Sequence, residues 1–493
     1  MKIALVAALA LASGVGCGTR TTGGAHTAPP AVAREFPATR WVPAQPTYVV
    51  AAPTVRQAQR GLRDLIDSLG VIAGIEASEV SRELSSLLAV DPLSPDALAG
   101  MGIDVDGGFA LFSDAISPTF VGHLSSPEAT ATFFDRQRER GLVTQSVVVD
   151  GVELFSAQLP GAQVRVSWAI DQDWLWVHFA IPGTGEDGQS WFQESRRRGG
   201  REPAWGDTWQ WAARATGNPK GVVGFVNPKE LLASFTSKVP DAIACARLLE
   251  PVSRVAIAVE GDGKRAAGRF AIDVGASARA VEATLLPAPE GFAAVARAAP
   301  LAVQWNADLF AVRAWLRPCA ASLDEDLAVL DRFGVKSARA VLVALDPDEK
   351  SGSGAVALDL AHKRFFAARL DDVPARSLIE RSRTFGPHRG HSLAVPFVAT
   401  VDYVLTDALA LGAVGDGLLA RVIGGGATVK GPIAAIDLAP PALSADAWRF
   451  LIDALDLGRA DRIVERLLRW RDGHVSLSVQ GTTLVLSASG NRR

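Results

Sequence analysis

A chain of 493 residues is too long for one ordinary hydrophobic core, so we expect several domains or one large repeated architecture. Hydrophobic residues make up 48% of the chain and charged residues 21%, which is typical of a folded soluble protein. The net charge of −3 supplies no basic surface field of the kind that attracts nucleic acid, so we expect no nucleic-acid partner.

The N-terminus resembles a bacterial lipoprotein signal. Lys2 precedes the apolar run 3–12, which is too short to cross a bilayer of about 30 Å as a helix. Small residues then lead to Cys17, which in such signals is diacylated and becomes the new N-terminus. We therefore predict a lipoprotein signal peptide over 1–16 and lipidation of Cys17, with acyl chains such as palmitate. The alternative is an ordinary secretory signal that leaves Cys17 as a free thiol.

The segment after Cys17 is rich in Gly, Thr and Pro and has no hydrophobic period, so we predict a flexible tether over 17–40. Farther along the chain, the best candidate for a membrane span is interrupted by Asp402, Asp407 and Asp416. We therefore expect an exported protein that is lipid-anchored to a bacterial membrane. The periplasmic face of the outer membrane is the favoured location.

Cys245 and Cys319 are the two remaining cysteines. In an exported chain an even number of cysteines suggests a disulfide. The alternative is two buried free thiols, since cysteine is often buried without a partner.

One pattern recurs four times: a short apolar strand, a polar or proline break, and an amphipathic helix. The four copies start near Pro46, Gly221, Pro300 and Gly431. At the last two starts, Asn306 and Ser444 are the predicted helix N-caps. Hairpins follow the helices, with predicted turns at Asp150-Gly151 and around Gly261 and Gly481, among others.

These patterns predict the α+β class as a tandem duplication. The first copy covers 41–299 and the second covers 300–493, each an antiparallel sheet with helices packed on one face. The segments "PTYVVAAP", "DALAGMGIDVDGGFALF" and "PTFVGHLSSPEATATFF" resemble uncharacterised bacterial exported lipoproteins with a tandem strand–helix–hairpin repeat. The resemblance implies fold and location and carries no catalytic signature.

Three motifs could in principle hold a cofactor or a metal. The glycines of "GTGEDG" match a nucleotide-binding loop, but the acidic residues between them would face phosphates, which favours a structural turn. His388 and His391 stand in a predicted loop with no third ligand. Asp104 and Asp106 are explained by turn chemistry. We therefore predict no cofactor, no metal and no catalytic residue.

The segment 190–217 concentrates tryptophan and arginine, the residues most enriched in interface hot spots. Its candidate partner-binding residues are Trp191, Arg196, Arg197, Arg198, Arg201, Trp205, Trp209 and Trp211. The corresponding place in the second copy is much shorter. Two interpretations stand: a surface that binds a partner, or a long capping loop whose tryptophans fill the core of the first copy.

The sequence therefore predicts a membrane-anchored, non-enzymatic protein of the cell envelope that binds a protein, lipid or glycan partner. A periplasmic solute-binding or carrier protein, with its ligand between the two copies, is the alternative. A hydrolase would need converging titratable groups in a pocket, and the sequence predicts none.

Overall fold

The structure is a computed structural model. It describes residues 35–73, 82, 85, 91–113, 116–158, 164–181, 187–198, 206–217, 220–235, 250–316, 333–371, 380–395, 399–424, 426–455 and 460–493. Several sequence predictions lie outside the described residues. They are the signal peptide, most of the tether, and the single positions Cys17, Arg201, Trp205, Cys245 and Cys319.

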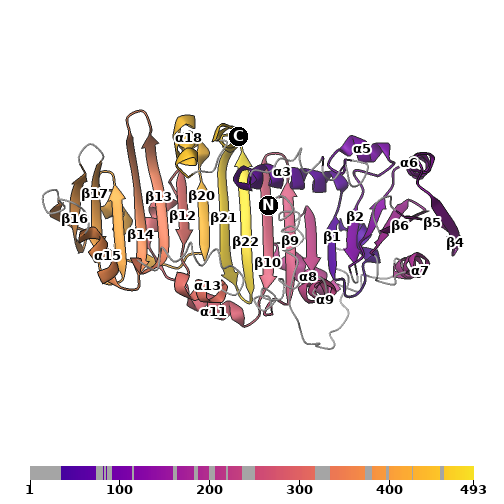
Figure 1. Cartoon of the computed structure of the whole chain (residues 1–493), viewed down its shortest axis with the longest axis horizontal. Coiled ribbons are helices and arrows are strands. Elements are labelled where there is room, and N and C mark those ends of the chain that lie inside the picture. Colours follow the sequence, from indigo (N-terminus) through magenta and orange to yellow (C-terminus); the bar gives the residue numbers. More distant parts are fainter. Residues whose placement is uncertain are drawn as a thin grey trace. The chain divides into compact units, whose positions relative to one another are not determined.

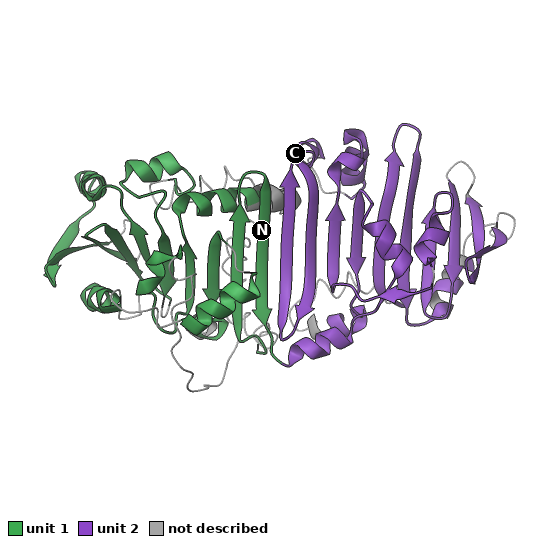
Figure 2. Ribbon diagram, turned by 180° about the vertical axis from the view of Figure 1, so that it is seen from behind, with its two compact units in different colours: residues 1–275 green, residues 276–493 purple. Residues whose placement is uncertain are grey.

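The chain divides into two compact units, 1–275 and 276–493, which Figure 2 colours separately. We expected a boundary after residue 299, and the structure places it after 275. The difference arises because the segment that follows Gly275 packs into the second unit. Phe292 shares a core cluster with Leu418 and Leu419, and the Leu286 N–H donates to the Asn306 carbonyl at 2.7 Å.

Unit 1 contains an antiparallel sheet in the order β4-β5-β6-β7-β3-β2-β1-β8-β9-β10 (Figure 1). Its strands are β1(Tyr48–Ala52), β2(Phe109–Ser113), β3(Thr119–His123), β4(Thr144–Val149), β5(Val152–Gln158), β6(Arg165–Asp171), β7(Trp174–Ala180), β8(Val222–Val226), β9(Arg254–Gly261) and β10(Arg265–Asp273). Its helices are η1(Pro37–Trp41), α3(Val55–Ala73), α5(Pro95–Gly100), α6(Pro127–Glu139), α7(Gly188–Arg198), α8(Gly206–Ala215) and α9(Pro228–Phe235).

Unit 2 contains an antiparallel sheet in the order β15-β16-β17-β18-β14-β13-β12-β20-β21-β22, and a short pair β11-β19. Its strands are β11(Ala288–Pro289), β12(Leu301–Trp305), β13(Val335–Asp346), β14(Ser351–Leu360), β15(Glu380–Phe385), β16(His388–Val395), β17(Ala399–Leu405), β18(Leu409–Val414), β19(Thr428–Val429), β20(Ala434–Leu438), β21(Trp470–Gln480) and β22(Thr483–Arg492). Its helices are α11(Ser277–Ala283), α12(Glu290–Ala296), α13(Leu309–Leu316), α15(Lys363–Asp371), α17(Leu418–Ile423), η2(Pro440–Ala442), α18(Ala445–Ala454) and α19(Ala460–Leu467).

The predicted α+β class is confirmed by these helices and large antiparallel sheets. The two main sheets also share one strand order. The first strand of each, β1 or β12, pairs on one side with the next strand in sequence, β2 or β13, and on the other side with a later strand, β8 or β20. The four strands that form the outer part of each sheet follow one another in sequence.

The prediction that helices cover only one face of the sheet is wrong for unit 2. Val341 packs in the core under α12 and α17, whereas Leu342 packs in the core under α18 and α19. Neighbouring residues of a strand point to opposite faces of the sheet. Helices therefore cover both faces, and the apolar residues of β13 run consecutively where they lie between the two layers.

Local turn and cap chemistry agrees with the sequence predictions at most positions. Asp150 and Gly151 have φ values of 48° and 81° and connect β4 to β5, as a type I′ hairpin turn requires. Ser444 accepts a hydrogen bond from the Ala447 N–H and caps α18. Asn306 does not cap a helix. Its side-chain amide donates to the Pro432 carbonyl, and Asp308 accepts from the Phe310 N–H.

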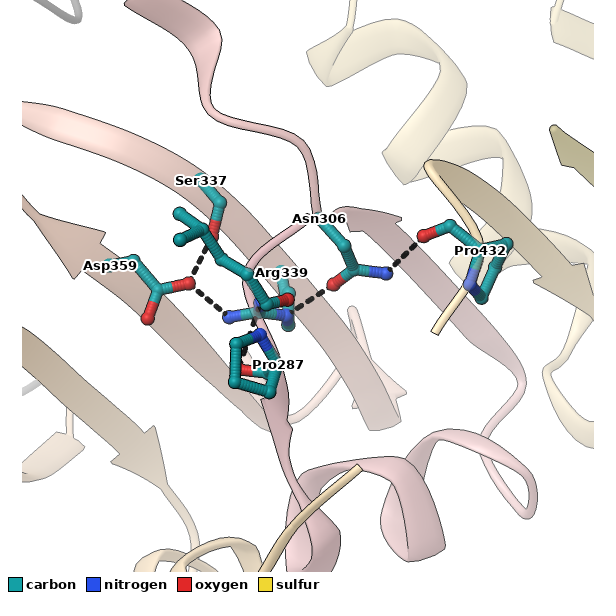
Figure 3. Close-up of polar contacts among 7 residues, drawn as sticks. Pro287, Asn306, Ser337, Arg339, Asp359 and Pro432 are labelled. Atoms are coloured by element: carbon teal, nitrogen blue, oxygen red, sulfur yellow. Dashed lines mark hydrogen bonds and ion pairs between the residues drawn. The ribbon is translucent and has the colours of Figure 1, made fainter. Parts of the chain in front are cut away.

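The Asn306 side chain belongs instead to a buried polar network in unit 2 (Figure 3). Its carbonyl oxygen accepts from Nε of Arg339, whose side chain is fully buried. Nη1 of Arg339 lies 2.8 Å from Asp359, which also accepts from the Ser337 hydroxyl. Nη2 donates to the Leu286 carbonyl at 3.0 Å. The guanidinium is thus satisfied from strands and from the segment before β11.

Candidate functional site

An open cleft of about 450 Å³ in unit 1 gathers tryptophan and arginine from three distant parts of the sequence. Its volume is within the range of small-ligand sites, about 300–1,000 Å³. The lining residues are Arg40, Trp41, Asp171, Gln172, Trp174, Trp176, Arg196 and Arg197. They come from the end of η1, the β6–β7 hairpin and the last turn of α7. We call this site the Arg/Trp cleft.

The N-terminal wall of the cleft is the short helix η1, which begins at Pro37. The Phe36 ring meets Trp209 edge-on at 4.9 Å, and the Thr39 hydroxyl donates to the Phe36 carbonyl at 2.7 Å. Phe36 and Ala38 are fully buried. Residues 36–40, which we expected in the tether, are therefore part of the folded unit, because apolar side chains at 36 and 38 are buried in its core.

Two tryptophan rings hold the Arg40 side chain at the cleft, and a third packs against one of them. Trp41 packs edge-on against Trp174 and Trp176, with centroids 4.3 Å and 5.0 Å apart. The Arg40 guanidinium lies 4.0 Å from the Trp41 ring centroid and 5.2 Å from that of Trp174, which is cation–π geometry. Its partial withdrawal from water lowers the pKa of Arg40. Among the described residues no carboxylate forms an ion pair with it.

The opposite wall is α7, whose start is fixed by Asp187. The Asp187 carboxylate accepts hydrogen bonds from the Ser190 N–H and hydroxyl and from the Gln189 N–H. The bond from the Ser190 N–H is the main cause of a lowered pKa at this carboxyl. A carboxylate that caps a helix N-terminus interacts favourably with the helix dipole and with the first N–H groups, which have no acceptor within the helix. This cap fixes where α7 begins, and α7 in turn carries the two cleft arginines.

The two arginines of α7 differ in their partners. Nε of Arg196 lies 2.7 Å from Asp171, and its Nη1 donates to the Asp150 carbonyl at 3.2 Å. Arg197 is exposed, and the structure gives it no ion pair or hydrogen bond within the described part of the chain. The cleft therefore presents two arginines without a counter-charge, Arg40 and Arg197, beside the ion pair of Arg196 with Asp171. Such an excess of guanidinium suits a phosphate or carboxylate group.

The other candidate residues of segment 190–217 have packing roles. Nε1 of Trp191 donates to the Thr119 hydroxyl at 2.9 Å, and its ring stacks on His178 at 4.5 Å. Trp209 is buried against Phe36. Trp211 lies under the Arg254 guanidinium at 4.2 Å, and Arg198 pairs with Glu194. Of the described candidates, only Arg196 and Arg197 reach the cleft.

A histidine and an aspartate lie next to the tryptophan cluster. Nδ1 of His123 is 2.8 Å from the Asp104 carboxylate, and the His123 ring meets Trp174 edge-on at 5.1 Å. This pairing would orient an imidazole base. Among the described residues, however, no hydroxyl or thiol lies within hydrogen-bonding distance of His123. Within the described residues the pair has no side-chain nucleophile beside it, and Asp104 also accepts from the Asp106 N–H in a tight turn.

The remaining sequence motifs have structural roles where they are described. The last glycine of "GTGEDG" is Gly188, the first residue of α7. The Asp187 carboxylate already accepts the N–H groups at the start of this helix that a bound phosphate would need. The prediction of a loop for His388 and His391 is wrong, because both lie in strand β16. His391 stacks on Tyr403 and pairs with Glu380 across the sheet. Within the described residues no group of three metal-ligating side chains was found.

Sequence reasoning missed Arg40, Trp41, Asp171, Trp174 and Trp176. Trp174 and Trp176 alternate with other residues along "DWLWVHF", a pattern typical of any half-buried strand. The dipeptide Arg40-Trp41 spans the predicted end of the tether. An aromatic residue that directly follows a polar tether is the one signal that could have pointed to this site.

Comparisons with known proteins do not assign this chain to a family. No protein-family description and no curated protein matches it. Among solved structures, crystal form III of TP0453 aligns with 11% identity over 50% of this chain and 86% of that chain, at a TM-score of 0.29. Crystal form IV aligns with 10% identity over 52% and 87%, at 0.28. TM-scores this low carry no argument about fold or function.

The stretch of sequence that came nearest to a membrane span is a pair of strands. The stretch interrupted by Asp402, Asp407 and Asp416 forms β17 and β18 over most of its length. Among the described residues, no helix combines the length and the apolar character that crossing a bilayer requires.

Proposed function

We propose that this protein is an exported, lipid-anchored protein of the bacterial cell envelope, which binds an anionic partner through the Arg/Trp cleft without chemical conversion. The observation that carries the proposal is the state of Arg40. Its guanidinium is exposed, lies against the Trp41 and Trp174 rings and has no carboxylate partner among the described residues. A guanidinium that aromatic rings hold in place and that has no counter-charge can bind an anion through two parallel hydrogen bonds.

The position of the cleft in the chain fits an anchored protein. Lipidation at Cys17 would leave only the segment up to Glu35 between the membrane and the folded unit. At full extension this segment reaches at most about 65 Å. Arg40 and Trp41 stand at the entry to unit 1, so an anchored cleft would stay within this reach of the membrane. A partner in the same envelope layer would meet it at high local concentration.

The chemistry of the cleft favours a lipid or glycan partner over a protein. The arginine fork binds phosphate and carboxylate groups in two-pronged hydrogen bonds. Trp174 is only half-buried and offers part of an aromatic ring beside these donors. Phosphate on a lipid headgroup and carboxylate on an acidic glycan both supply the anion. At about 450 Å³ the cleft has room for such a group and for part of the molecule that carries it.

We also infer that the two units arose by tandem duplication. The support is the shared order of strands in the two sheets, with β1 to β10 in unit 1 corresponding in turn to β12 to β18 and β20 to β22 in unit 2. The cleft is specific to unit 1. Where α7 carries Arg196 and Arg197, the helix after β18 is α17, a shorter helix with a single arginine, Arg421.

Binding of the full chain with Cys17→Ser, which carries no acyl chains that would insert into every vesicle, to defined anionic probes tests the function of the cleft. The probes are vesicles of phosphatidylcholine with and without phosphatidylglycerol, and soluble polygalacturonate. We expect binding to at least one anionic probe and none to phosphatidylcholine alone. Arg40→Ala and Arg197→Ala should each weaken binding about tenfold, which corresponds to about 1.4 kcal/mol.

The matched control is Arg381→Ala, since Arg381 is also exposed and has no ion pair in the described part of the chain. It should leave binding unchanged. Equal losses in all three variants would mean that net charge drives binding rather than the cleft. No binding to any anionic probe would overturn the proposal.

A further inference from the structure

Strand β4 forms one edge of the unit 1 sheet and pairs, among the described strands, with β5 alone (Figure 1). Its residues are unusually apolar for such an exposed position. Val143, just before the strand, is 82% exposed, Val148 is 68% exposed and Val147 is 44% exposed. The outward N–H and C=O groups of an edge strand offer a ready template for another strand.

The corresponding edge of unit 2 is protected, which shows what β4 lacks. Strand β15 has the same burial pattern as β4, in which a half-buried residue is followed by four exposed residues and a buried one. In β15 the exposed residues include Arg381 and Arg383, and charged side chains on an edge oppose strand addition. In β4 the exposed residues are Gln145, Ser146, Val147 and Val148, and none is charged.

The open backbone edge decides which kind of partner fits. A lipid surface would cover the valines, but it cannot supply hydrogen bonds to an open sheet edge, and such edges do not occur in the hydrocarbon region of membranes. A second β-strand satisfies the backbone groups and covers the valines together. The partner is therefore an extended strand of neutral, apolar character.

Charges at the two ends of β4 make the strand complementary to itself. Arg140 precedes the strand and Asp150 follows it, and both are exposed. Among the described residues, neither side chain forms an ion pair. In an antiparallel pair of two β4 strands related by a twofold axis, each Arg140 approaches the partner's Asp150. No like charges face each other, because residues 143–149 carry none.

From these observations we propose that β4 is a dimerisation edge, which pairs antiparallel with β4 of a second copy of this chain. The pairing joins two sheets into one and buries Val147 and Val148 of both copies. β-branched residues facing each other across antiparallel strands stabilise such pairs. The dimer would present two Arg/Trp clefts, one in each copy, because no residue of β4 lines the cleft. The link between the cleft and the strand is the hydrogen bond from Arg196 to the Asp150 carbonyl.

Sedimentation velocity of the purified full chain in a mild non-ionic detergent is the first test. We expect a monomer–dimer equilibrium at about micromolar concentration, as small interfaces give. Val148→Lys should shift the chain to monomer, because a charge on the edge opposes pairing. The matched control is Val356→Lys, since Val356 is 42% exposed but lies in β14, which is paired on both sides. It should leave the dimer intact, and circular dichroism checks that both variants fold.

Disulfide trapping is the second test, and it reports on the contact itself. Near a twofold axis, facing residues of antiparallel strands have Cα atoms about 4.5–5.5 Å apart, within disulfide range. With Arg140 opposite Asp150, Gln145 faces Gln145 of the second copy. Gln145→Cys should therefore give a cross-linked dimer under mild oxidation, above the background of the parent chain. Val356→Cys should not. A monomer at all concentrations, or a dimer that persists in Val148→Lys and is not cross-linked by Gln145→Cys, would overturn the proposal.

Discussion

At the scale of single residues, Arg339 shows why a buried charge is retained in unit 2. Its guanidinium donates to Asn306, Asp359 and the Leu286 carbonyl, so no donor group of the network faces an apolar surface alone (Figure 3). A buried pair contributes little net stability compared with apolar residues of the same shape, but removal of one partner leaves the other charge unpaired. The network is therefore sensitive to single substitutions and tolerant of paired ones.

Arg339→Met should destabilise unit 2 by up to about 3 kcal/mol, because it leaves the partly buried Asp359 carboxylate with the Ser337 hydroxyl but without its counter-charge. The double variant Arg339→Met/Asp359→Leu should recover much of this loss. The exposed control, Arg381→Met, should change stability by no more than about 0.5 kcal/mol. Hydrogen exchange of the β13 and β14 amides measures all three. A cost of Arg339→Met as small as that of Arg381→Met would contradict the assigned role.

At the scale of elements, the start of α7 depends on the ionised Asp187 cap. The carboxylate has a lowered pKa in the folded state, so its stabilising effect is present above the ordinary pKa of aspartate, about 3.9, and is lost as pH falls through the folded value. Asp187→Ala should cost about 1 kcal/mol at pH 7 and less at pH 3, below the ordinary pKa of aspartate.

Hydrogen exchange of the α7 amides at the two pH values tests the cap. Asp187→Ser is the control, because a serine also caps a helix but does not titrate. Its effect should be independent of pH. A pH-independent cost of Asp187→Ala would mean that the charge plays no part.

The contact between α12 and α17 is a second element on which the fold depends. A Cβ at Gly291 would lie 2.2 Å from the Arg421 carbonyl and 2.6 Å from that of Val422. Gly291→Ala should therefore push the two helices apart and cost about 1–3 kcal/mol. Gly412→Ala is the matched control, since a Cβ there meets no atom within 4 Å. Thermal unfolding compares the two, and an equal, small effect would contradict the close packing.

Elements whose conformation is set locally could be predicted from the sequence. The Asp150-Gly151 turn and the Ser444 cap depend on the residues themselves and their immediate neighbours. The prediction of a loop for His388 and His391 was wrong, because the nearby glycines and proline are typical of a loop, whereas pairing with β15 and β17 makes this segment a strand. The Asn306 cap failed because a distant arginine, Arg339, competes for the same side chain.

At the scale of the whole molecule, the sequence could not reveal features that depend on distant contacts. The boundary after residue 275 results from packing of α12 against α17, which follows much later in the chain. The Arg/Trp cleft joins residues near 40, 174 and 196, and no local pattern links them. The tryptophan-rich segment was noticed because its residues are adjacent, yet most of its described tryptophans pack in unit 1.

Where the whole molecule resides rests on Cys17, which lies outside the described residues. If Cys17 is lipidated, the mature chain begins there and carries diacylglycerol and an amide-linked acyl chain. Each buried CH₂ contributes about 0.8 kcal/mol to membrane binding, and more than one chain gives stable anchoring. Mass spectrometry of the mature N-terminus should therefore find a modified Cys17, and the protein should fractionate with membranes.

Cys17→Ser is the decisive variant, because it removes the thiol that carries the lipid and changes nothing in the described units. It should keep the unmodified precursor and lose the acyl mass. The matched control is a serine at Cys245, which should leave the N-terminal modification intact. An unmodified Cys17 in the wild-type chain, or cleavage at another residue, would mean that no lipid at Cys17 anchors the protein. Binding to anionic vesicles would then depend on Arg40 and Arg197 alone.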